Sequence, residues 1–241
     1  MKAITTRRPV ISVSNSKTGT PSFNTLAGNG LYNGCTPATD AAREKIAAAG
    51  ICPGELFGTC AYNCPGCYAK KMTRYTDVYI NMAINTIIAR EDPDAIRDAV
   101  RDFCNLNEPR RFRIHDSGDF FSLEYVELWD AIARENVDTV FYTYTKRIDL
   151  IREFSEKHGR RPAFVIQLST WAGICELDDI RAAGLDDLPR FEYDDGSRPE
   201  LSTVPHCPAV DKDGRRTGIT CNMCKHCSRA KSGDVWAVYA H

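Results

Sequence analysis

Residues 111–170 read RFRIHDSGDFFSLEYVELWDAIARENVDTVFYTYTKRIDLIREFSEKHGRRPAFVIQLST. Short runs rich in Val, Ile, Phe and Tyr alternate in this stretch with longer runs of helical period. The pattern predicts strands at residues 111–115, 139–145 and 163–169, and helices at residues 122–134 and 148–157. Strand and helix in this rhythm form right-handed βαβ units, so the sequence predicts an α/β fold with a parallel sheet.

The flanking sequence predicts further helices and two short strands. A helix is expected from Thr36 as N-cap and Pro37 at the first position to a terminating Gly50, and two more at residues 76–90 and from Pro93 onward. Short strands are expected at residues 10–13 and 235–239. We expect an α/β domain at residues 1–190, with an N-terminal extension, and a small cysteine-rich module at residues 191–241 packed on it.

Charge and hydropathy narrow the class of protein. The chain has 31 basic and 32 acidic side chains, so it has no bulk positive field and nucleic-acid binding is not supported. The basic, polar start resembles no signal peptide, and no stretch is apolar for the length needed to cross a bilayer. We therefore expect a cytoplasmic protein without a membrane partner.

The chain holds 11 cysteines, a high number for 241 residues. Without an export signal, a secreted disulfide framework is not expected. Closely spaced thiolates in a reducing compartment usually bind a soft metal. Two groups are spaced in this way, while Cys35, Cys104 and Cys175 are expected to be core residues. The two metal-binding groups are Cys60, Cys64 and Cys67, and Cys207, Cys221, Cys224 and Cys227.

The first group reads CAYNCPGC at residues 60–67, within a stretch at residues 52–71 that Pro and Gly are expected to make irregular. The CxxxCxxC spacing lets three thiolates converge on three corners of a [4Fe-4S] cluster and leaves the fourth iron open. Cys52 is a candidate fourth ligand that would close the cluster. Zinc is an alternative, although it prefers four ligands and only one CxxC pair is present here.

The second group reads CNMCKHC at residues 221–227. Its CxxCxxC spacing recurs in ferredoxin-type [4Fe-4S] sites, where a remote cysteine followed by proline completes the set. Cys207 is followed by Pro208 and fits that position. Four thiolates close the site, which predicts a structural or electron-relay role. A zinc site is the alternative, with His226 as a further candidate ligand.

Polar residues follow the predicted strands at the edge where parallel sheets bind ligands. In HDSGD, residues 115–119, Gly118 permits close backbone approach, and exposed amides there would hold a carboxylate or an amino group. A turn that caps the next helix is the alternative. Lys146 ends the second strand as a cation that can meet a carboxylate or phosphate.

The CxxxCxxC spacing before a helix and a series of βα units resembles the radical S-adenosylmethionine (SAM) enzymes. The resemblance implies a partial (β/α) barrel or open parallel sheet, with SAM bound at the open iron. Gly66 departs from this pattern, because an aromatic residue usually stands there, and Tyr68 is the nearest aromatic candidate. The cofactor-binding residues that the resemblance implies are Tyr68, His115, Asp116, Ser117, Gly118, Asp119, Lys146, Gln167 and Ser169.

Four longer motifs are similar to the phage gene-product-88 family, which is related to the radical SAM group. They are CYAKK at residues 67–71, RIHDSGDFFSLEYVELWDAIA at residues 113–133, FYTYTK at residues 141–146 and CNMCKHC at residues 221–227. The resemblance implies a phage protein in the host cytoplasm that carries two [4Fe-4S] clusters. Its substrate and electron donor remain unassigned.

Three hypotheses for function remain open. The first is a radical SAM-type enzyme that cleaves SAM to start radical chemistry on a substrate, a reaction whose difficult step the cofactor carries. The second is a non-enzymatic two-cluster protein, structural or electron-transferring, that keeps the fold without binding SAM. The third is an interaction module stapled by zinc.

Overall fold

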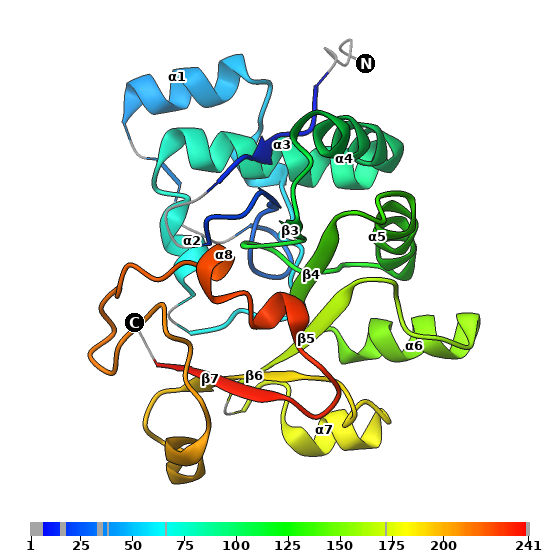
Figure 1. The fold of residues 1–241 in the computed structure, drawn as a ribbon. Helices are drawn as coiled ribbons and strands as arrows, with labels where there is room; N and C mark the ends of the chain where they lie inside the picture. The colour runs from blue at the N-terminus through cyan, green and yellow to red at the C-terminus, as the bar shows by residue number, and fades with distance from the viewer. Residues whose placement is uncertain are drawn as a thin grey trace.

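The computed structural model describes residues 7–14, 18–32, 36–37, 39–65, 67–171 and 173–239. These residues form one seven-stranded sheet in the order β1-β2-β3-β4-β5-β6-β7 (Figure 1). Only β1 and β2 pair in antiparallel fashion, and every pair from β2 to β7 is parallel. The strands are β1 (Ile11–Ser12), β2 (Ser22–Phe23), β3 (Arg111–Arg113), β4 (Val140–Thr145), β5 (Val165–Thr170), β6 (Arg190–Asp194) and β7 (Val235–Tyr239). An open, mostly parallel sheet of the α/β class is thereby confirmed.

Helices cover the sheet in sequence order, as βαβ crossovers require. Figure 1 shows α5, α6 and α7 along one side of the sheet and α8 on the other. The α-helices are α1 (Asp40–Ala48), α2 (Tyr68–Met72), α3 (Thr76–Glu91), α4 (Pro93–Asn107), α5 (Leu123–Glu135), α6 (Ile148–His158), α7 (Leu177–Ala182) and α8 (Cys221–Cys224). The 3₁₀ helices are η1 (Pro53–Glu55), η2 (Pro199–Thr203) and η3 (Cys227–Arg229).

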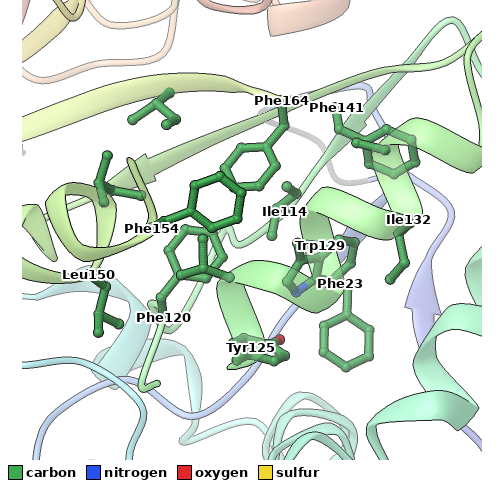
Figure 2. Close-up of a cluster of buried hydrophobic side chains, with 14 of the residues drawn as sticks. Phe23, Ile114, Phe120, Tyr125, Trp129, Ile132, Phe141, Leu150, Phe154 and Phe164 are labelled. Carbon is green, nitrogen blue, oxygen red and sulfur yellow. The ribbon is translucent and has the colours of Figure 1, made fainter. Parts of the chain in front are cut away.

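The main core lies between the strands and helices α3 to α7. Trp129 of α5 is fully buried against Phe23, Phe112 and Phe141 of three strands. Figure 2 shows Phe120, Phe154 and Phe164 gathered beside this group. Burial of large aromatic side chains is the main stabilising contribution here.

Strand β4 is covered on both faces, which explains its continuous apolar and aromatic sequence. Its side chains alternate between the two faces of the sheet. Phe141 belongs to the core under the helices, whereas Tyr142 and Tyr144 line a cavity on the opposite face with cysteines of the C-terminal segment. The sheet therefore presents a row of tyrosines to the segment that carries the second cysteine group.

The predicted elements of the central stretch are confirmed with small shifts at their ends. Helix α5 starts after Ser122, whose hydroxyl accepts from the amide of Tyr125 at 3.2 Å. Strand β3 ends earlier than predicted, at Arg113, and His115 beyond it has a φ of 109° that no regular strand accommodates. The short strand predicted at residues 10–13 and the last strand at residues 235–239 are both present.

Two predictions near the N-terminal half are corrected. Helix α1 begins at Asp40 rather than at Pro37, because Thr39 is the N-cap and its hydroxyl accepts from the amide of Ala42 at 3.2 Å. The stretch at residues 52–71 is not irregular throughout, since α2 begins at Tyr68 directly after the third cysteine. Of the expected core cysteines, Cys104 and Cys175 are buried, and Cys35 lies outside the described residues.

Strand β6 has no counterpart in the sequence prediction. Its sequence, RFEYD, contains three charged residues, which hide the strand alternation. The structure shows why a strand can carry these charges. Glu192 is buried and accepts from Arg190 at 3.2 Å and from Arg198 at 2.8 Å, so its charge is compensated inside the fold. Helix α7 was not predicted either.

The sheet runs across the boundary predicted at residue 190. Strand β6 begins at Arg190, and β7 adds to it as the next parallel strand. Ala209, Val210 and Val238 form a small apolar cluster of their own between these last strands and the cysteine-rich segment. No helix among the described residues is both long and apolar enough to span a membrane.

Candidate functional site

A cavity of about 190 Å³ opens at the carboxyl ends of the parallel strands. Loops after β3, β4 and β5 meet there with the cysteine loop that precedes α2, because parallel strands end at the same edge of a sheet. Residues predicted separately from four parts of the sequence therefore line one space. The predicted site residues that line it are Cys60, Cys64, Cys67, Tyr68, His115, Asp116, Ser117, Gly118, Asp119, Lys146 and Ser169.

Two candidates lie elsewhere. Cys52 is exposed at the N-cap of η1 and is not among the residues that line the cavity. Gln167 is buried in β5, and its side-chain amide donates to the carbonyl of Cys227 at 3.1 Å. Gln167 thus contacts the second cysteine group rather than the cavity. Gly66 lies outside the described residues.

The loop at residues 115–119 is held tightly against the N-terminal part of the chain. Asn24 accepts from the amides of Asp116 and Ser117 at 2.7 and 3.2 Å. The hydroxyl of Thr59 accepts from the amide of Asp119 at 3.1 Å. The expectation of exposed amides is therefore wrong at these three positions, because protein side chains occupy them. The sequence carried no signal for Asn24, which lies far from the loop along the chain.

Asp119 is a buried carboxylate that joins two strand-end loops. It accepts from the Thr145 hydroxyl at 2.6 Å and from the Lys146 amide at 3.0 Å. Burial raises the pKa of Asp119, and these hydrogen bonds oppose the rise. The carboxylate thus fixes the end of β4 beside the cysteines.

Lys146 places a cation on the wall of the same cavity. Its ammonium group donates to the hydroxyl of Ser169 at 2.9 Å and lies 5.1 Å from the centre of the Trp171 ring. Trp171 in turn stacks on Tyr193 with their ring centres 4.0 Å apart. The contact between Lys146 and Ser169 joins two residues that the sequence analysis selected independently.

His115 is neutral in this environment. Burial lowers its pKa to about 3, with the nearby Arg113 adding to the effect. Its Nε2 atom lies 3.1 Å from the Tyr125 hydroxyl, while Nδ1 has no hydrogen-bond partner among the described residues. His115 also packs edge-on against the buried Phe120, so its ring contributes to core packing as well as to the cavity wall.

Burial changes the pKa of two thiols of the first group, Cys60 and Cys64. Burial raises the pKa of Cys60 to about 12, and the charge of Asp119 adds to it. Burial raises the pKa of Cys64 too, against the opposing charge of Lys146. Without a metal these thiols are therefore protonated at neutral pH. A bound metal favours the thiolate strongly, so binding there would release protons.

The four cysteines of the second group line a smaller cavity of about 30 Å³ on the other side of Tyr144. Tyr142, Tyr144 and His226 complete much of its wall. The ring of His226 packs on Trp236 with centres 3.6 Å apart, and its buried Nε2 has no hydrogen-bond partner among the described residues. A buried polar atom without a partner is costly, so this nitrogen is available to a further hydrogen-bond or metal partner.

The described cysteines do not gather in threes around one point. No disulfide joins any of the described cysteines. Within the described part of the chain, no three or more His, Cys, Asp or Glu side chains are arranged to hold a metal ion. Both groups instead surround a cavity, with the sulfur-bearing residues on its walls.

An ion pair at the cavity wall was missed by the sequence analysis. Arg113 and Asp116 approach to 2.7 Å with side chains only 12% and 10% exposed. The guanidinium of Arg113 also lies 4.5 Å from the centre of the Tyr144 ring. Their opposite charges three positions apart, at the end of a strand, were the available signal. Trp171 and Tyr193 were missed as well, because an aromatic residue near a strand end is common.

The comparisons with known proteins agree with the motifs. The family model described as gene product 88 matches residues 9–230, a span that includes both cysteine groups. The chain belongs to the gene product 88 family. Gene 88 proteins of Mycobacterium phages L5 and D29 are each 30% identical over 90 residues. Each match covers 33% of this chain and 38% of the relative, so it spans well under half of either protein. No solved structure matches this chain significantly. The relatives support a bacteriophage origin.

Proposed function

We propose that this gene product 88 family member is a protein with two iron-sulfur clusters. Cys60, Cys64 and Cys67 would hold the first cluster, and Cys207 with residues 221–227 would hold the second. The observation that carries the proposal is that each cysteine group lines a single cavity. Thiolates are soft ligands that bind iron-sulfur clusters. Cysteines spaced around a cavity suit a cluster of several iron and sulfide atoms better than a single metal ion.

The residues of the first cavity fit a cluster with one open iron. Three thiols reach the cavity, and Cys52, the candidate fourth ligand, does not line it. Such a cluster, when bound, would supply an electron and an open coordination position to SAM, the chemistry implied by the radical SAM resemblance. The chain's own residues would bind and orient the second ligand. Lys146 and Ser169 offer a cation and a hydroxyl beside the cysteines.

A two-cluster protein that does not bind SAM is the second candidate. One specific observation favours it. The amides of Asp116, Ser117 and Asp119, which were expected to hold the cofactor, already donate to protein side chains. In this version the first cluster would store or transfer electrons. Zinc at the second group is the remaining alternative, and the unpartnered Nε2 of His226 favours a zinc ligand there.

Metal analysis of protein purified without oxygen tests the proposal. Two [4Fe-4S] clusters require about eight iron atoms and about eight sulfides per chain. Replacing Cys64 with serine should reduce both counts by about half. Cys52→Ser is the matched control, because it removes an exposed cysteine from the same loop and should leave both counts unchanged.

Two results would reject the proposal or part of it. Protein with neither iron nor acid-labile sulfide contradicts it entirely, and zinc without sulfide replaces it with the zinc-stapled module. SAM binding is decided by electron paramagnetic resonance of the reduced protein. Added SAM should change the signal that Cys64→Ser removes and leave the other signal unchanged. If added SAM does not change the signal of the first cluster, the non-enzymatic candidate is favoured.

A further inference from the structure

Tyr144 lies between the two cysteine groups. It is one of the residues that line both cavities, the one beside Cys60, Cys64 and Cys67 and the one beside the C-terminal cysteines. The Tyr144 hydroxyl is a hydrogen-bond partner of the Cys227 thiol. On the other side, the Tyr144 ring lies 4.5 Å from the guanidinium carbon of Arg113, which belongs to the first cavity.

Tyr68 and Arg113 line the first cavity together with Tyr144, and these three side chains form a layer on its wall. Tyr68 follows Cys67 directly, and its hydroxyl donates to the carbonyl of Asp116. Tyr144 also lines the second cavity, so the two cysteine groups lie on either side of its side chain.

The C-terminal cysteine segment is fixed against the strands that carry this layer. Gln167 of β5 donates to the carbonyl of Cys227 at 3.1 Å. Arg111 of β3 is buried and donates to the Ser228 hydroxyl at 2.8 Å. The amide of Asn222 donates to the carbonyl of Thr18 at 2.9 Å. These contacts come from three different parts of the chain, so they hold the second group against the sheet.

We infer that the two cysteine groups form one redox unit in which the C-terminal cluster relays an electron to the first cluster past Tyr144. The inference rests on the proposed function. If both clusters are bound, an external low-potential one-electron donor of the ferredoxin or flavodoxin class would reduce the C-terminal cluster by one electron. That cluster would return to its oxidised state by passing the electron to the first cluster, which would be reduced by one electron. Four thiolates leave the C-terminal cluster no open iron for a substrate, which suits a relay.

The short separation has a spectroscopic consequence. Two paramagnetic clusters held across one layer of side chains interact magnetically. In anaerobic protein reduced with dithionite, the electron paramagnetic resonance spectrum should therefore differ from the sum of two single-cluster spectra. Cys64→Ser and Cys224→Ser variants, each lacking one cluster, supply those spectra. Faster spin relaxation in the two-cluster protein is the expected additional sign.

The hydroxyl of Tyr144 gives a second, independent readout. Hydrogen bonds to cluster sulfurs stabilise the reduced state and raise the reduction potential. Tyr144→Phe should therefore lower the midpoint potential of the C-terminal cluster and leave that of the first cluster unchanged. Tyr142→Phe is the matched control. Tyr142 lines the same cavity, but its hydroxyl pairs with Thr20 at 3.2 Å, so the potential should not change.

The outcomes separate the inference from the proposed function. Protein that contains both clusters, but whose spectrum equals the sum of the single-cluster spectra, overturns the inference and leaves the two-cluster function standing. An unchanged potential in Tyr144→Phe overturns the role of that residue. Protein without iron and sulfide overturns both. A coupled spectrum with a potential shift confined to Tyr144→Phe supports the relay.

Discussion

Gly118 lies in the loop that lines the first cavity, where the backbone comes close to two threonine side chains. Its φ is 90°, in the region that only glycine adopts without strain. A Cβ atom there would lie 1.9 Å from the Thr25 hydroxyl oxygen and 2.6 Å from that of Thr59. The glycine thus allows two protein hydroxyls, rather than a ligand, to approach the strand-end loop.

Gly118→Ala is expected to destabilise the protein by roughly 2–5 kcal/mol, because backbone strain and the clash add. Denaturant unfolding of the purified variant measures the loss. Gly196→Ala is the matched control, since Gly196 also has a positive φ, 83°, but a methyl group added there would meet no atom within 4 Å beyond its chain neighbours. The control should lose only roughly 1–2 kcal/mol. Equal losses in the two variants would show that the contact with Thr25 is unimportant.

Asp130 carries a pH dependence that is separate from the cysteines. Its side chain is 8% exposed and receives hydrogen bonds from Arg160 at 2.6 Å and from the Ala163 amide at 2.7 Å. Burial alone raises the pKa of Asp130, but the hydrogen bonds from Arg160, Ala163 and Arg134 outweigh it, so the pKa is lowered. The stabilisation is therefore full above the unfolded pKa of about 3.9 and is lost as the pH falls through the folded pKa.

Asp130→Asn should cost roughly 1–3 kcal/mol at pH 7. The difference from the unsubstituted protein should begin to shrink below about pH 4, where the unfolded carboxylate takes up a proton, and should go on shrinking as the pH falls through the lowered folded pKa. Unfolding free energies measured from pH 3 to pH 7 check this. Asp178→Asn is the control, because the Asp178 side chain is 93% exposed, and its effect should stay within about 0.5 kcal/mol. A constant penalty across the pH range would refute the assignment.

Helix α5 determines the position of the cavity loop at residues 115–119, because the helix begins soon after that loop ends. Its N-cap Ser122 ends the sequence that contains Asp119, and its buried face packs on the sheet through Trp129 and Ile132. The start of the helix therefore fixes where the loop must turn. This start was correctly predicted, since a serine before a helical apolar repeat is a strong local signal.

Ser122→Ala should lower the unfolding free energy by about 1 kcal/mol, because the amide of Tyr125 loses its hydrogen-bond acceptor. Ser122→Asp should restore most of the stability, since aspartate is also a good N-cap and its charge suits the helix N-terminus. Thermal unfolding of the three proteins side by side is the measurement. If aspartate were as harmful as alanine, the serine would act through packing and not through the cap.

Helices and strands that carry local sequence signals could be predicted. Elements that depend on contacts between distant parts of the chain could not. The helix at residues 122–134 has its own N-cap residue, Ser122, and the helix at residues 76–90 was predicted from its apolar periodicity. Strand β6 has no such local signal, because the burial of Glu192 depends on Arg198 beyond the end of the strand. The cap of α1 was displaced. The sequence prediction placed the cap at Thr36, whereas in the folded chain the hydroxyl of Thr39 caps the helix.

Across the whole molecule, one sheet edge gathers residues that the sequence selected one motif at a time. The alternating pattern predicted that three strand-end loops would meet, which is why most candidate residues line the same cavity. The sequence did not indicate that the C-terminal cysteines lie on the opposite side of Tyr144. That arrangement depends on β7 joining the sheet beside β6 and on buried contacts such as Arg111 with Ser228.

The two sides of the sheet differ in what stabilises them, and this leads to a prediction about metal removal. The helical side has a large aromatic core, whereas the apolar cluster beside the C-terminal cysteines contains only three buried residues among those described. Binding of a metal group to thiolates contributes folding free energy. The C-terminal segment should therefore depend on its cluster for order, and β4 and β5 should not.

Anaerobic removal of iron with a chelator should accelerate amide hydrogen exchange at residues 205–229 and in β7, while β4 and β5 keep their protection. Mass spectrometry of peptides from the loaded and the chelated protein gives the comparison. A Cys207→Ser variant should exchange quickly in the same segment before any chelator is added, because its second cluster lacks a ligand. Exchange that is identical with and without iron would mean that packing alone orders this segment. Loss of protection in β4 would mean instead that the cluster supports the whole sheet.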